Sequence, residues 1–274
     1  MQSLSTIRAL LDDRGLRPKH RLGQNFLHDQ NQIRKLLAAA GVASGDLVLE
    51  VGPGTGALTE ALVDAGAEVI ASELDDDMAN IVADRLALRV TLIRGDCLEG
   101  KRALAPAVRT ALAGRPFLLI ANLPYGAATP LMATLLVSHP ECRGQFVTVQ
   151  REVADRLAAA PGTKTCGSLS VIAQSLATVE VISILPGSCF WPAPEVTSAM
   201  IAIRPFVPRP THDAESLANF VGMLFQRRRK QLGSILGRTL AWPEGIQATM
   251  RPESLTPAQA IALQAAVEGM RNEE

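Results

Sequence analysis

The 274-residue sequence lacks the features of membrane-embedded, exported and disordered proteins. No apolar run reaches about 18 uninterrupted residues, the length that crosses a bilayer. The opening residues, MQSLSTIRALLDDRG, contain acids where a secretory signal has a basic segment followed by an apolar one. With 47% hydrophobic and 20% charged residues, the composition is that of a folded globular protein. We therefore expect a cytoplasmic protein without a membrane segment.

Cysteine is scarce, and its spacing excludes the common structural metal sites. The sequence has four cysteines and four histidines. The cysteines form no CxxC pair, and no histidine lies at the spacing of a zinc ligand set. This pattern indicates a reducing compartment and predicts no bound metal. The cysteines are Cys97, Cys142, Cys166 and Cys189.

Net charge is also absent, because 27 Lys and Arg residues balance 27 Asp and Glu residues. The overall composition therefore gives no indication of a nucleic-acid partner. The basic residues nevertheless gather in two clusters, each of which is either a solvated surface or a contact surface for phosphates. The candidate RNA contacts in these clusters are Arg17, Lys19, Arg21, Arg227, Arg228, Arg229 and Lys230.

Short β-rich apolar runs alternate with helical patterns from residue 47 onward. This alternation predicts an α/β fold with a doubly wound, mostly parallel, seven-stranded sheet. Only a loop rich in Pro and Gly separates the last two runs, so we expect an antiparallel end to the sheet. Asp75 marks the start of one helix, and Thr129-Pro130 marks another as N-cap and first position. The runs span residues 47–51, 68–72, 89–93, 117–121, 145–149, 179–185 and 198–203.

A proline-rich segment, RPFVPRPTHD, follows the last of these runs. No strand-like run remains after it, and the apolar spacing of residues 217–225 predicts an amphipathic helix. Another helix is expected from Thr256-Pro257. We therefore predict that residues 1–206 form the α/β domain, with a basic N-terminal segment over 1–28. Residues 207–274 would form a small helical domain that positions RNA.

A glycine-rich loop follows the first predicted strand of the sheet. Gly52, Gly54 and Gly56 stand after the acid Glu50 in the order G-x-G-x-G. Glycines allow a sharp turn and let a ligand approach the main chain. The third glycine comes one residue too early for a dinucleotide fingerprint, which argues against NAD.

Polar residues also follow the next three strands. Glu73, Asp96 and Asn122 occupy these positions. In an open α/β sheet, ligands bind outside the carboxyl ends of the strands, so these side chains should converge on one crevice with Gly52. Glu73 suits the two hydroxyls of a ribose. The pattern predicts a nucleoside cofactor and resembles that of class I S-adenosylmethionine-dependent methyltransferases.

Residues 122–125 read Asn-Leu-Pro-Tyr, which resembles the signature of methyltransferases that act on planar amino nitrogens. The N6 lone pair of adenine is delocalised into the ring and is therefore a poor nucleophile. The Asn122 side-chain oxygen and the Leu123 carbonyl, made available by Pro124, would accept both N6 hydrogens and localise the lone pair for in-line transfer. Tyr125 would stack on the extruded base.

Further motifs in the same order resemble the ribosomal RNA adenine dimethyltransferase family, in particular its members that act on bacterial 16S rRNA. The resemblance spans about residues 20–240 and includes RLGQNFLHD from Arg21. The later motifs are QREV from Gln150, GSLS from Gly167, FWPAPEVTS from Phe190 and FQRRRK from Phe225.

This resemblance implies N6,N6-dimethylation of two adjacent adenosines in the 3′-terminal hairpin loop of 16S rRNA. It implies S-adenosylmethionine as cofactor and an immature 30S subunit as partner, and we expect a monomer. Asn25 and Leu27 would close over the cofactor, and Asp96 would bind its adenine amine. The implied cofactor residues are Asn25, Leu27, Gly52, Gly54, Gly56, Glu73, Asp96 and Asn122. The implied catalytic residues are Asn122, Leu123, Pro124, Tyr125 and Phe190, with Phe190 facing Tyr125 across the target base.

Two departures from the family pattern lie on the side of the target base. Gly126 stands where the family usually has Asn, and Ser168 lies in a segment that lacks the usual aromatic and basic residues.

Three other functions share part of the pattern. A DNA adenine-N6 methyltransferase would need a separate target-recognition domain, for which the chain has little room. A 23S rRNA adenine-N6 methyltransferase is closer. The third alternative is a ribosome-assembly factor with weak or lost methylation. The intact motifs argue against it, but Gly126 is compatible with it.

Overall fold

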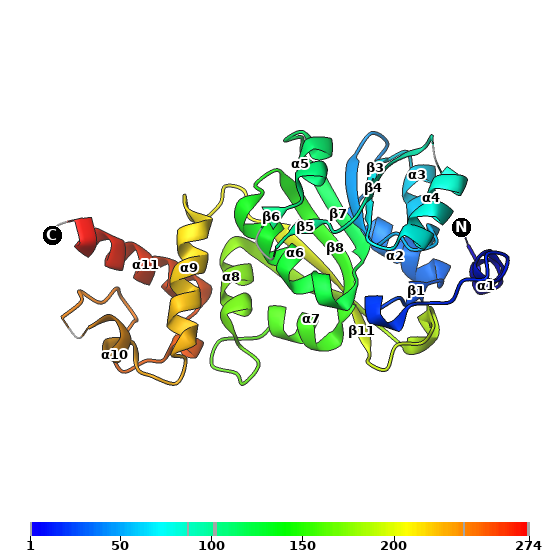
Figure 1. The fold of residues 1–274 in the computed structure, drawn as a ribbon. Helices are drawn as coiled ribbons and strands as arrows, with labels where there is room; N and C mark the ends of the chain where they lie inside the picture. The colour runs from blue at the N-terminus through cyan, green and yellow to red at the C-terminus, as the bar shows by residue number, and fades with distance from the viewer. Residues whose placement is uncertain (1, 87, 101–102, 238, 273–274) are drawn as a thin grey trace. The chain divides into compact units, whose positions relative to one another are not determined.

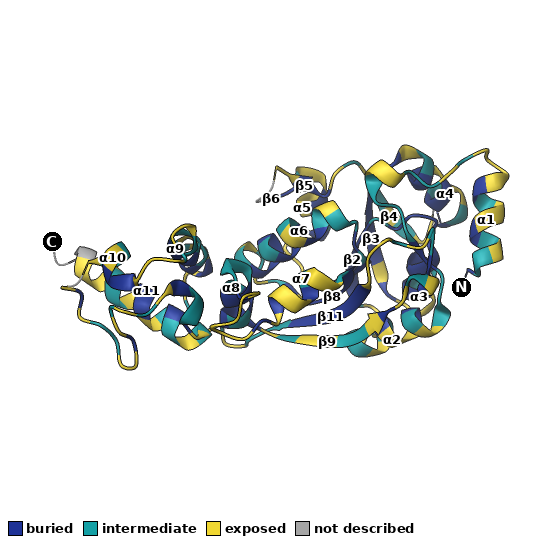
Figure 2. Cartoon of the chain, turned by 90° about the horizontal axis from the view of Figure 1, so that it is seen from below, coloured by how far each residue is buried: buried dark blue, intermediate teal, exposed yellow. Residues whose placement is uncertain are grey.

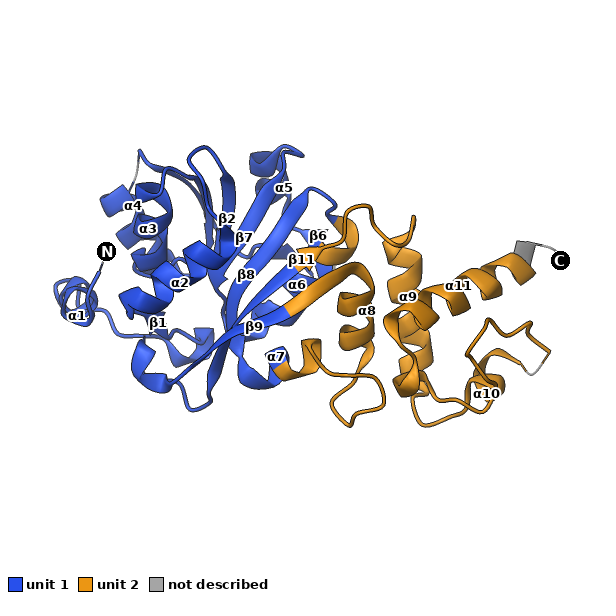
Figure 3. Ribbon diagram, turned by 180° about the vertical axis from the view of Figure 1, so that it is seen from behind, with its two compact units in different colours: residues 1–135, 139–154, 180–203 blue, residues 136–138, 155–179, 204–274 orange. Residues whose placement is uncertain are grey.

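The computed structural model describes residues 2–86, 88–100, 103–237 and 239–272. The chain forms two compact units (Figure 3). Unit 1 contains residues 1–135, 139–154 and 180–203, and unit 2 contains residues 136–138, 155–179 and 204–274. Among the described residues, no helix is long and apolar enough to cross a membrane.

Unit 1 is built on a seven-stranded sheet with the order β4-β3-β2-β7-β8-β11-β9 (Figure 1). The pairs β2–β3, β3–β4, β2–β7 and β7–β8 are parallel, and β11 is antiparallel to β8. The predicted fold class, all seven strands and the antiparallel end are therefore confirmed. The strands are β2 (Leu47–Val51), β3 (Glu68–Glu73), β4 (Val90–Arg94), β7 (Phe117–Asn122), β8 (Cys142–Gln150), β9 (Ala177–Leu185) and β11 (Ser198–Pro205).

Burial explains why the central strands read as continuous apolar runs. Every residue of β2 is buried, and β7 is buried except at its last residue, because helices cover both faces of a parallel sheet. On one face, α2 (Gln30–Ala40) and α3 (Ala57–Asp64) share a core cluster with alternate residues of the strands, such as Val48 and Leu118. Figure 2 shows β8 and β11 mostly buried, while exposed residues follow the outer face of α7 (Arg151–Leu157).

The predicted helix start at Asp75 is confirmed, whereas the start at Thr129-Pro130 is wrong. Asp75 precedes α4 (Asp76–Leu86), and its side chain accepts a hydrogen bond from the Asp77 amide at 3.1 Å. The other helix, α6, spans Tyr125–Ser138 and holds Pro130 inside it. Pro124 at its N-cap already has φ −57°, so the helix begins directly after the loop that follows β7. Pro130 is the sixth residue of α6, so its missing amide leaves the Gly126 carbonyl without an intrahelical hydrogen bond.

The N-terminal segment contributes α1 (Leu4–Asp12), the 3-10 turn η1 (His20–Leu22) and β1 (Phe26–Leu27). Strand β1 pairs antiparallel with β10 (Phe190–Trp191), so residues far apart in the sequence form a two-stranded ribbon. The remaining short elements of unit 1 are β5 (Leu98–Glu99), β6 (Ala103–Leu104), α5 (Pro106–Leu112) and η2 (Gly187–Cys189).

Unit 2 has a small apolar core of its own, which includes Leu224, Leu232 and Leu263. The predicted helices appear as α9 (Ala214–Gln226) and α11 (Pro257–Asn272), and both pack against α8 (Ser168–Leu176). This packing groups residues 155–179 with the C-terminal segment, whereas we predicted a division at residue 206. The other elements of unit 2 are α10 (Leu232–Leu236) and η3 (Pro252–Ser254).

Candidate functional site

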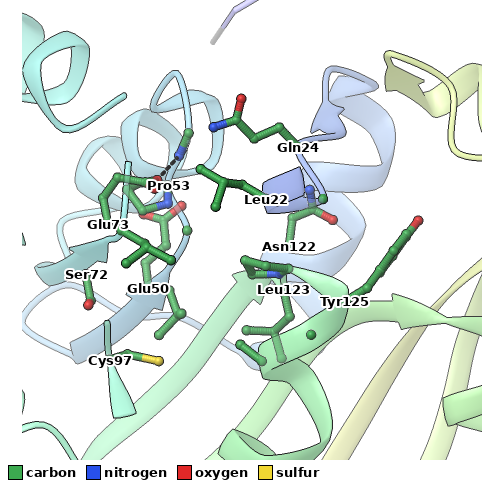
Figure 4. A pocket seen from close by; sticks show the side chains of 18 of the residues that line it. Leu22, Gln24, Glu50, Pro53, Ser72, Glu73, Cys97, Asn122, Leu123 and Tyr125 are labelled. Atoms are coloured by element: carbon green, nitrogen blue, oxygen red, sulfur yellow. Dashed lines mark hydrogen bonds between the residues drawn. The ribbon is translucent and has the colours of Figure 1, made fainter. Parts of the chain in front are cut away.

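A cavity of about 440 Å³ lies in unit 1 where the parallel strands end. Figure 4 shows Glu50 and Glu73 on one side of it and Asn122 and Tyr125 on the other. The crevice at the carboxyl ends of β2, β3 and β7 is thus where the sequence predicted it. The predicted site residues that line the cavity are Arg21, Asn25, Leu27, Gly52, Gly54, Glu73, Asp96, Asn122, Leu123, Pro124, Tyr125 and Phe190.

Gly56 does not line this cavity. It has φ +86°, and a Cβ there would lie 3.5 Å from Leu86 Cδ1. Its glycine is explained by this left-handed backbone at the N-cap of α3, because only glycine adopts that conformation without strain. A direct cofactor contact by Gly56 remains a prediction.

The other two glycines of the loop each have a positive φ and one side chain so close that a Cβ would contact it. Gly52 has φ +74°, and a Cβ there would lie 3.0 Å from Pro124 Cγ. Gly54 has φ +58°, and a Cβ there would lie 2.9 Å from the ring of Phe26. The loop is therefore held between the motif after β7 and the N-terminal strand β1, with its backbone facing the cavity.

Glu73 ends β3 with its carboxylate buried beside this loop. One oxygen accepts a hydrogen bond from the Gly54 amide at 3.0 Å, and the other accepts one from the Asp75 amide at 2.9 Å. Burial raises the pKa of Glu73 above its ordinary value, and these amide hydrogen bonds oppose that rise. A carboxylate has about four acceptor positions, so both oxygens can still receive a hydroxyl.

Asp96 lies two residues beyond β4 and is exposed at the cavity. One of its oxygens accepts a hydrogen bond from the Leu98 amide at 2.9 Å, which fixes the carboxylate. The second oxygen suits an amino group, because an ionised carboxylate only accepts hydrogen bonds.

Asn122 ends β7, and its amide has a defined orientation. Its Nδ2 donates to the main-chain oxygen of Asn25 at 2.8 Å. The donor end of the amide is therefore bound to the N-terminal segment, and Oδ1 is the end that can accept from a ligand. In Figure 4, Asn122 lies between the two acids and Tyr125.

The other residues of the Asn-Leu-Pro-Tyr motif, residues 123–125, are held in place by the sheet and by α6. The Leu123 amide donates to the Thr148 carbonyl at 3.1 Å, which ties the loop to β8. The Tyr125 hydroxyl lies 3.4 Å from Ser198 Oγ, and the ring is half-buried. Gly126 is exposed, and a Cβ built there meets no atom within 4 Å.

The β1–β10 ribbon places Phe190 opposite Leu27, and both line the cavity. Phe190 is only 4% exposed and belongs to the same core cluster as α2 and α3. Its neighbour Trp191 stacks on Phe26 with ring centroids 6.4 Å apart, and the guanidinium of Arg8 lies 5.3 Å from the Trp191 ring. The aromatic expected beside the target base is thus held by the segment that is expected to close over the cofactor.

The cavity residues absent from our sequence-based list include Glu50 and Gln24. Glu50 is 1% exposed, and desolvation raises its pKa to about 8. Its Oε2 is buried without a hydrogen-bond partner in the described part of the chain. Gln24 lies at the cavity within the RLGQNFLHD motif. The signals for both residues were visible, since Glu50 precedes the glycine loop and Gln24 lies inside a family motif.

The predicted RNA contacts differ in their surroundings. Arg17 forms an ion pair with Asp12, and Lys19 lies 2.6 Å from both Asp75 and Asp77. Arg21 is exposed at the cavity. In unit 2, Arg228 lies 2.8 Å from Glu253, and the three exposed members of that cluster are Arg227, Arg229 and Lys230.

Residues 226–230 and Ser234 surround a basic hollow in unit 2. The described residues include no group of three or more His, Cys, Asp or Glu side chains that could hold a metal ion. All four cysteines are buried free thiols.

The chain is similar to known proteins over most of its length. A family profile described as "Ribosomal RNA adenine dimethylase" matches residues 15–266. A Rhodococcus opacus protein named ribosomal RNA small subunit methyltransferase A is 39% identical over 279 positions, covering 94% of this chain and 92% of the relative. A relative of the same name from Phenylobacterium zucineum is 38% identical and covers 96% and 93%, respectively.

Two solved structures share the fold. The dimethyladenosine transferase of Plasmodium falciparum superposes with a TM-score of 0.72 at 22% identity, covering 90% of this chain and 98% of that structure. The 23S rRNA methyltransferase ErmE superposes with a TM-score of 0.69 at 21% identity, covering 89% and 100%. The class I methyltransferase fold is thereby confirmed.

Proposed function

Because the chain belongs to the ribosomal RNA adenine dimethylase family, we propose that it dimethylates N6 of two adjacent adenosines in the 3′-terminal hairpin loop of 16S rRNA. It is an S-adenosylmethionine-dependent rRNA adenine methyltransferase. The names of its curated relatives support the small subunit as the source of the substrate. The observation that carries the proposal is the orientation of Asn122, whose acceptor oxygen is available where cofactor and base would meet.

The residues present fit the cofactor. A Cβ at Gly52 would contact Pro124, and a Cβ at Gly54 would contact Phe26. Both positions therefore require glycine, and a ligand in the cavity meets main-chain atoms there. The carboxylates of Glu73 and Asp96 match a ribose and an adenine amine, and Asn25 and Leu27 form the wall on the N-terminal side. When bound, S-adenosylmethionine supplies a methyl group on a sulfonium, which is the electrophile of the reaction.

The motif after β7 prepares the nucleophile. Asn122 Oδ1 and the Leu123 carbonyl accept hydrogen bonds from the two N6 hydrogens of adenine, which draws the lone pair out of the ring system. The Asn25 carbonyl fixes the Asn122 amide in this sense, so no reorientation is needed when the base arrives. In the first transfer the N6–CH3 bond forms as the S–CH3 bond breaks, and N6 then loses one proton to solvent. One N6 hydrogen remains, and one acceptor is enough to orient the amine for the second transfer.

Tyr125 and Phe190 hold the base between aromatic faces. Both rings line the cavity, Tyr125 half-exposed and Phe190 buried in the wall. Base–aromatic stacking tolerates an extruded nucleotide and contributes about 1–3 kcal/mol per base. The pair therefore supports recognition of a flipped adenine rather than of a duplex.

The basic clusters support contact with rRNA phosphates. The exposed cations are Arg17, Arg21, Arg227, Arg229 and Lys230. Because the net charge is zero, binding depends on these local clusters and should weaken with salt. We propose a monomer that acts in the cytoplasm on immature 30S subunits without a metal, with residues 207–274 helping to place the RNA.

The test is methyl transfer from radiolabelled S-adenosylmethionine to immature 30S subunits from a strain lacking its own dimethyltransferase. We expect N6,N6-dimethyladenosine at two adjacent positions of the 3′-terminal hairpin of 16S rRNA. In a parallel assay with protein-free 23S rRNA, label on that RNA and none on the 30S subunits would identify the other rRNA class as the substrate. Cofactor binding without transfer to either RNA would leave an assembly factor as the function.

A further inference from the structure

A polar network ties the N-terminal segment to the loop after β3. Lys19 Nζ lies 2.6 Å from an oxygen of Asp75 and 2.6 Å from an oxygen of Asp77. Gln24 Nε2 donates to the second oxygen of Asp75 at 2.6 Å, and Gln24 Oε1 accepts from the Lys19 amide at 2.7 Å. Both oxygens of the Asp75 carboxylate are therefore bound by residues more than 50 positions away in the sequence.

This network reaches the cofactor site through one further hydrogen bond. The Asp75 amide donates to Glu73 Oε1 at 2.9 Å, while the Gly54 amide holds the other Glu73 oxygen. Asp75 is 4% exposed, so its position depends on its protein partners rather than on solvent. Lys19 thus acts on Glu73 through a single intermediate residue, and Gln24 in the same network lines the cavity.

The electrostatics fit a structural role for the Lys19 charge. Burial would raise the pKa of Asp75, but hydrogen bonds from Lys19, Gln24 and the Asp77 amide outweigh it and hold the pKa below its ordinary value. The same two carboxylates raise the pKa of Lys19. An ammonium between two carboxylates belongs to a locally negative group, which is a poor partner for an RNA phosphate.

We propose that Lys19 is a positioning residue for the cofactor, acting through Asp75 on Glu73, and that it does not bind RNA phosphate. The proposal rests on the proposed role of Glu73 as the ribose ligand. Without the ammonium, Asp75 would be a buried carboxylate with one partner fewer, and the amide that fixes Glu73 would move. The cost should fall on the nucleoside half of the cofactor.

The experiment compares the binding of two probes by calorimetry, S-adenosylhomocysteine and 5′-methylthioadenosine, which lacks the amino-acid end. We expect Lys19→Met and Asp75→Asn to weaken both probes about tenfold. The double variant should weaken them no further, because both changes break one network. Lys19→Arg, which keeps a cation near both carboxylates, should restore most of the affinity. At saturating cofactor, kcat should stay close to that of the unchanged protein.

Two variants serve as matched controls. Asp77→Asn removes a carboxylate from Lys19 without touching the Asp75–Glu73 link, so it should change probe affinity by less than about threefold. Arg17→Met removes an exposed cation of the same segment and should leave probe affinity unchanged. On rRNA, Arg17→Met should reduce the salt slope by about 0.7–0.9, and Lys19→Met should leave it unchanged.

Unchanged probe affinity in a folded Lys19→Met protein would overturn the proposal, as would a loss confined to S-adenosylhomocysteine or a reduced salt slope. If thermal unfolding shows that Lys19→Met does not fold, Lys19→Gln provides the same test, because it keeps a donor without the charge. Glu73→Ala tests the ribose role of Glu73 separately from the role of Lys19. If that variant binds methylthioadenosine normally, the ribose role of Glu73 fails, whatever Lys19 does.

Discussion

The cavity has a proposed cofactor wall around Glu73, Gly52 and Gly54 and a proposed base wall around Tyr125 and Gly126, and the two are built in different ways. On the cofactor wall, Glu73 is buried with both oxygens bound by amides, and Gly52 and Gly54 leave no space beside the backbone. On the base wall, Tyr125 is half-exposed with one hydroxyl contact at 3.4 Å, and Gly126 faces open space. Sites for small cofactors are usually largely formed before the ligand binds. The base arrives on an RNA, which can supply the rest of its own wall.

Asn122 belongs to both walls, and its removal should have the largest effect. Asn122→Ala deletes one acceptor for the target amine and the donor to the Asn25 carbonyl. We expect kcat to fall by about 10²–10³, the loss typical of one transition-state hydrogen bond. Methyl transfer to 30S subunits measures this effect.

Circular dichroism and cofactor binding provide the controls for Asn122→Ala. The fold should be retained, because Asn122 is only partly buried at the end of β7. A variant with turnover like that of the unchanged protein would exclude the proposed mechanism.

Glu50 tests how much the buried carboxyl in the cofactor wall lowers the free energy of unfolding of the protein. Its folded pKa of about 8 exceeds its ordinary value of 4.5, so the folded state binds more protons between these pH values. Stability of the cofactor-free protein should therefore fall as pH rises through this window, by up to about 1.4 kcal/mol per pH unit. Glu50→Gln should remove this slope and be the more stable protein above pH 8.

Denaturant unfolding of both proteins at several pH values measures the effect. At pH 5 the two proteins should have similar stability, because the Glu50 carboxyl is then protonated in the folded state. Parallel pH profiles would show that the buried carboxyl does not titrate as its burial requires.

The sequence predicted which residues line the cofactor wall better than it predicted the distant hydrogen bonds that hold them in place. Burial on both faces makes central strands apolar, so the strands were recognisable, and parallel strands bring Glu73 and Asp96 to one edge. The bond from Asn122 to the Asn25 carbonyl joins residues 97 positions apart, and no local pattern marks it. Lys19 is similar, since a basic run looks the same whether a lysine faces solvent or a buried Asp75.

Helix boundaries show the same division between local and distant causes. Asp75 was recognised as a helix start because its side chain caps the next turn, which is a local interaction. Thr129-Pro130 carried the same local signal, but the loop after β7 fixes Pro124 and starts the helix at Tyr125. The requirement of the site on that loop outweighed the local preference of Pro130.

Tyr125 tests the base wall alone. Tyr125→Ala removes one stacking face, and we expect kcat/KM for 30S subunits to fall about 5- to 150-fold, corresponding to about 1–3 kcal/mol per base. Tyr125→Phe keeps the ring and loses only the long contact with Ser198, so it should behave like the unchanged protein. Cofactor affinity should be the same in all three proteins. A loss of cofactor affinity in Tyr125→Ala would place the ring in the cofactor wall and show that the two walls are not separate.

Substitution of Gly126 should give the smallest effect. It tests whether the RNA fills the open space beside Gly126 in the base wall. Gly126→Asn introduces a side chain into free space in the first turn of α6, so folding and cofactor affinity should not change. One added polar contact to the RNA should lower KM for 30S subunits by about threefold. Gly126→Ala is the matched control, because it adds the Cβ without a polar group and should leave KM unchanged. An equal decrease in KM for Gly126→Ala would mean that rigidity of the helix start, rather than contact with RNA, limits the base wall.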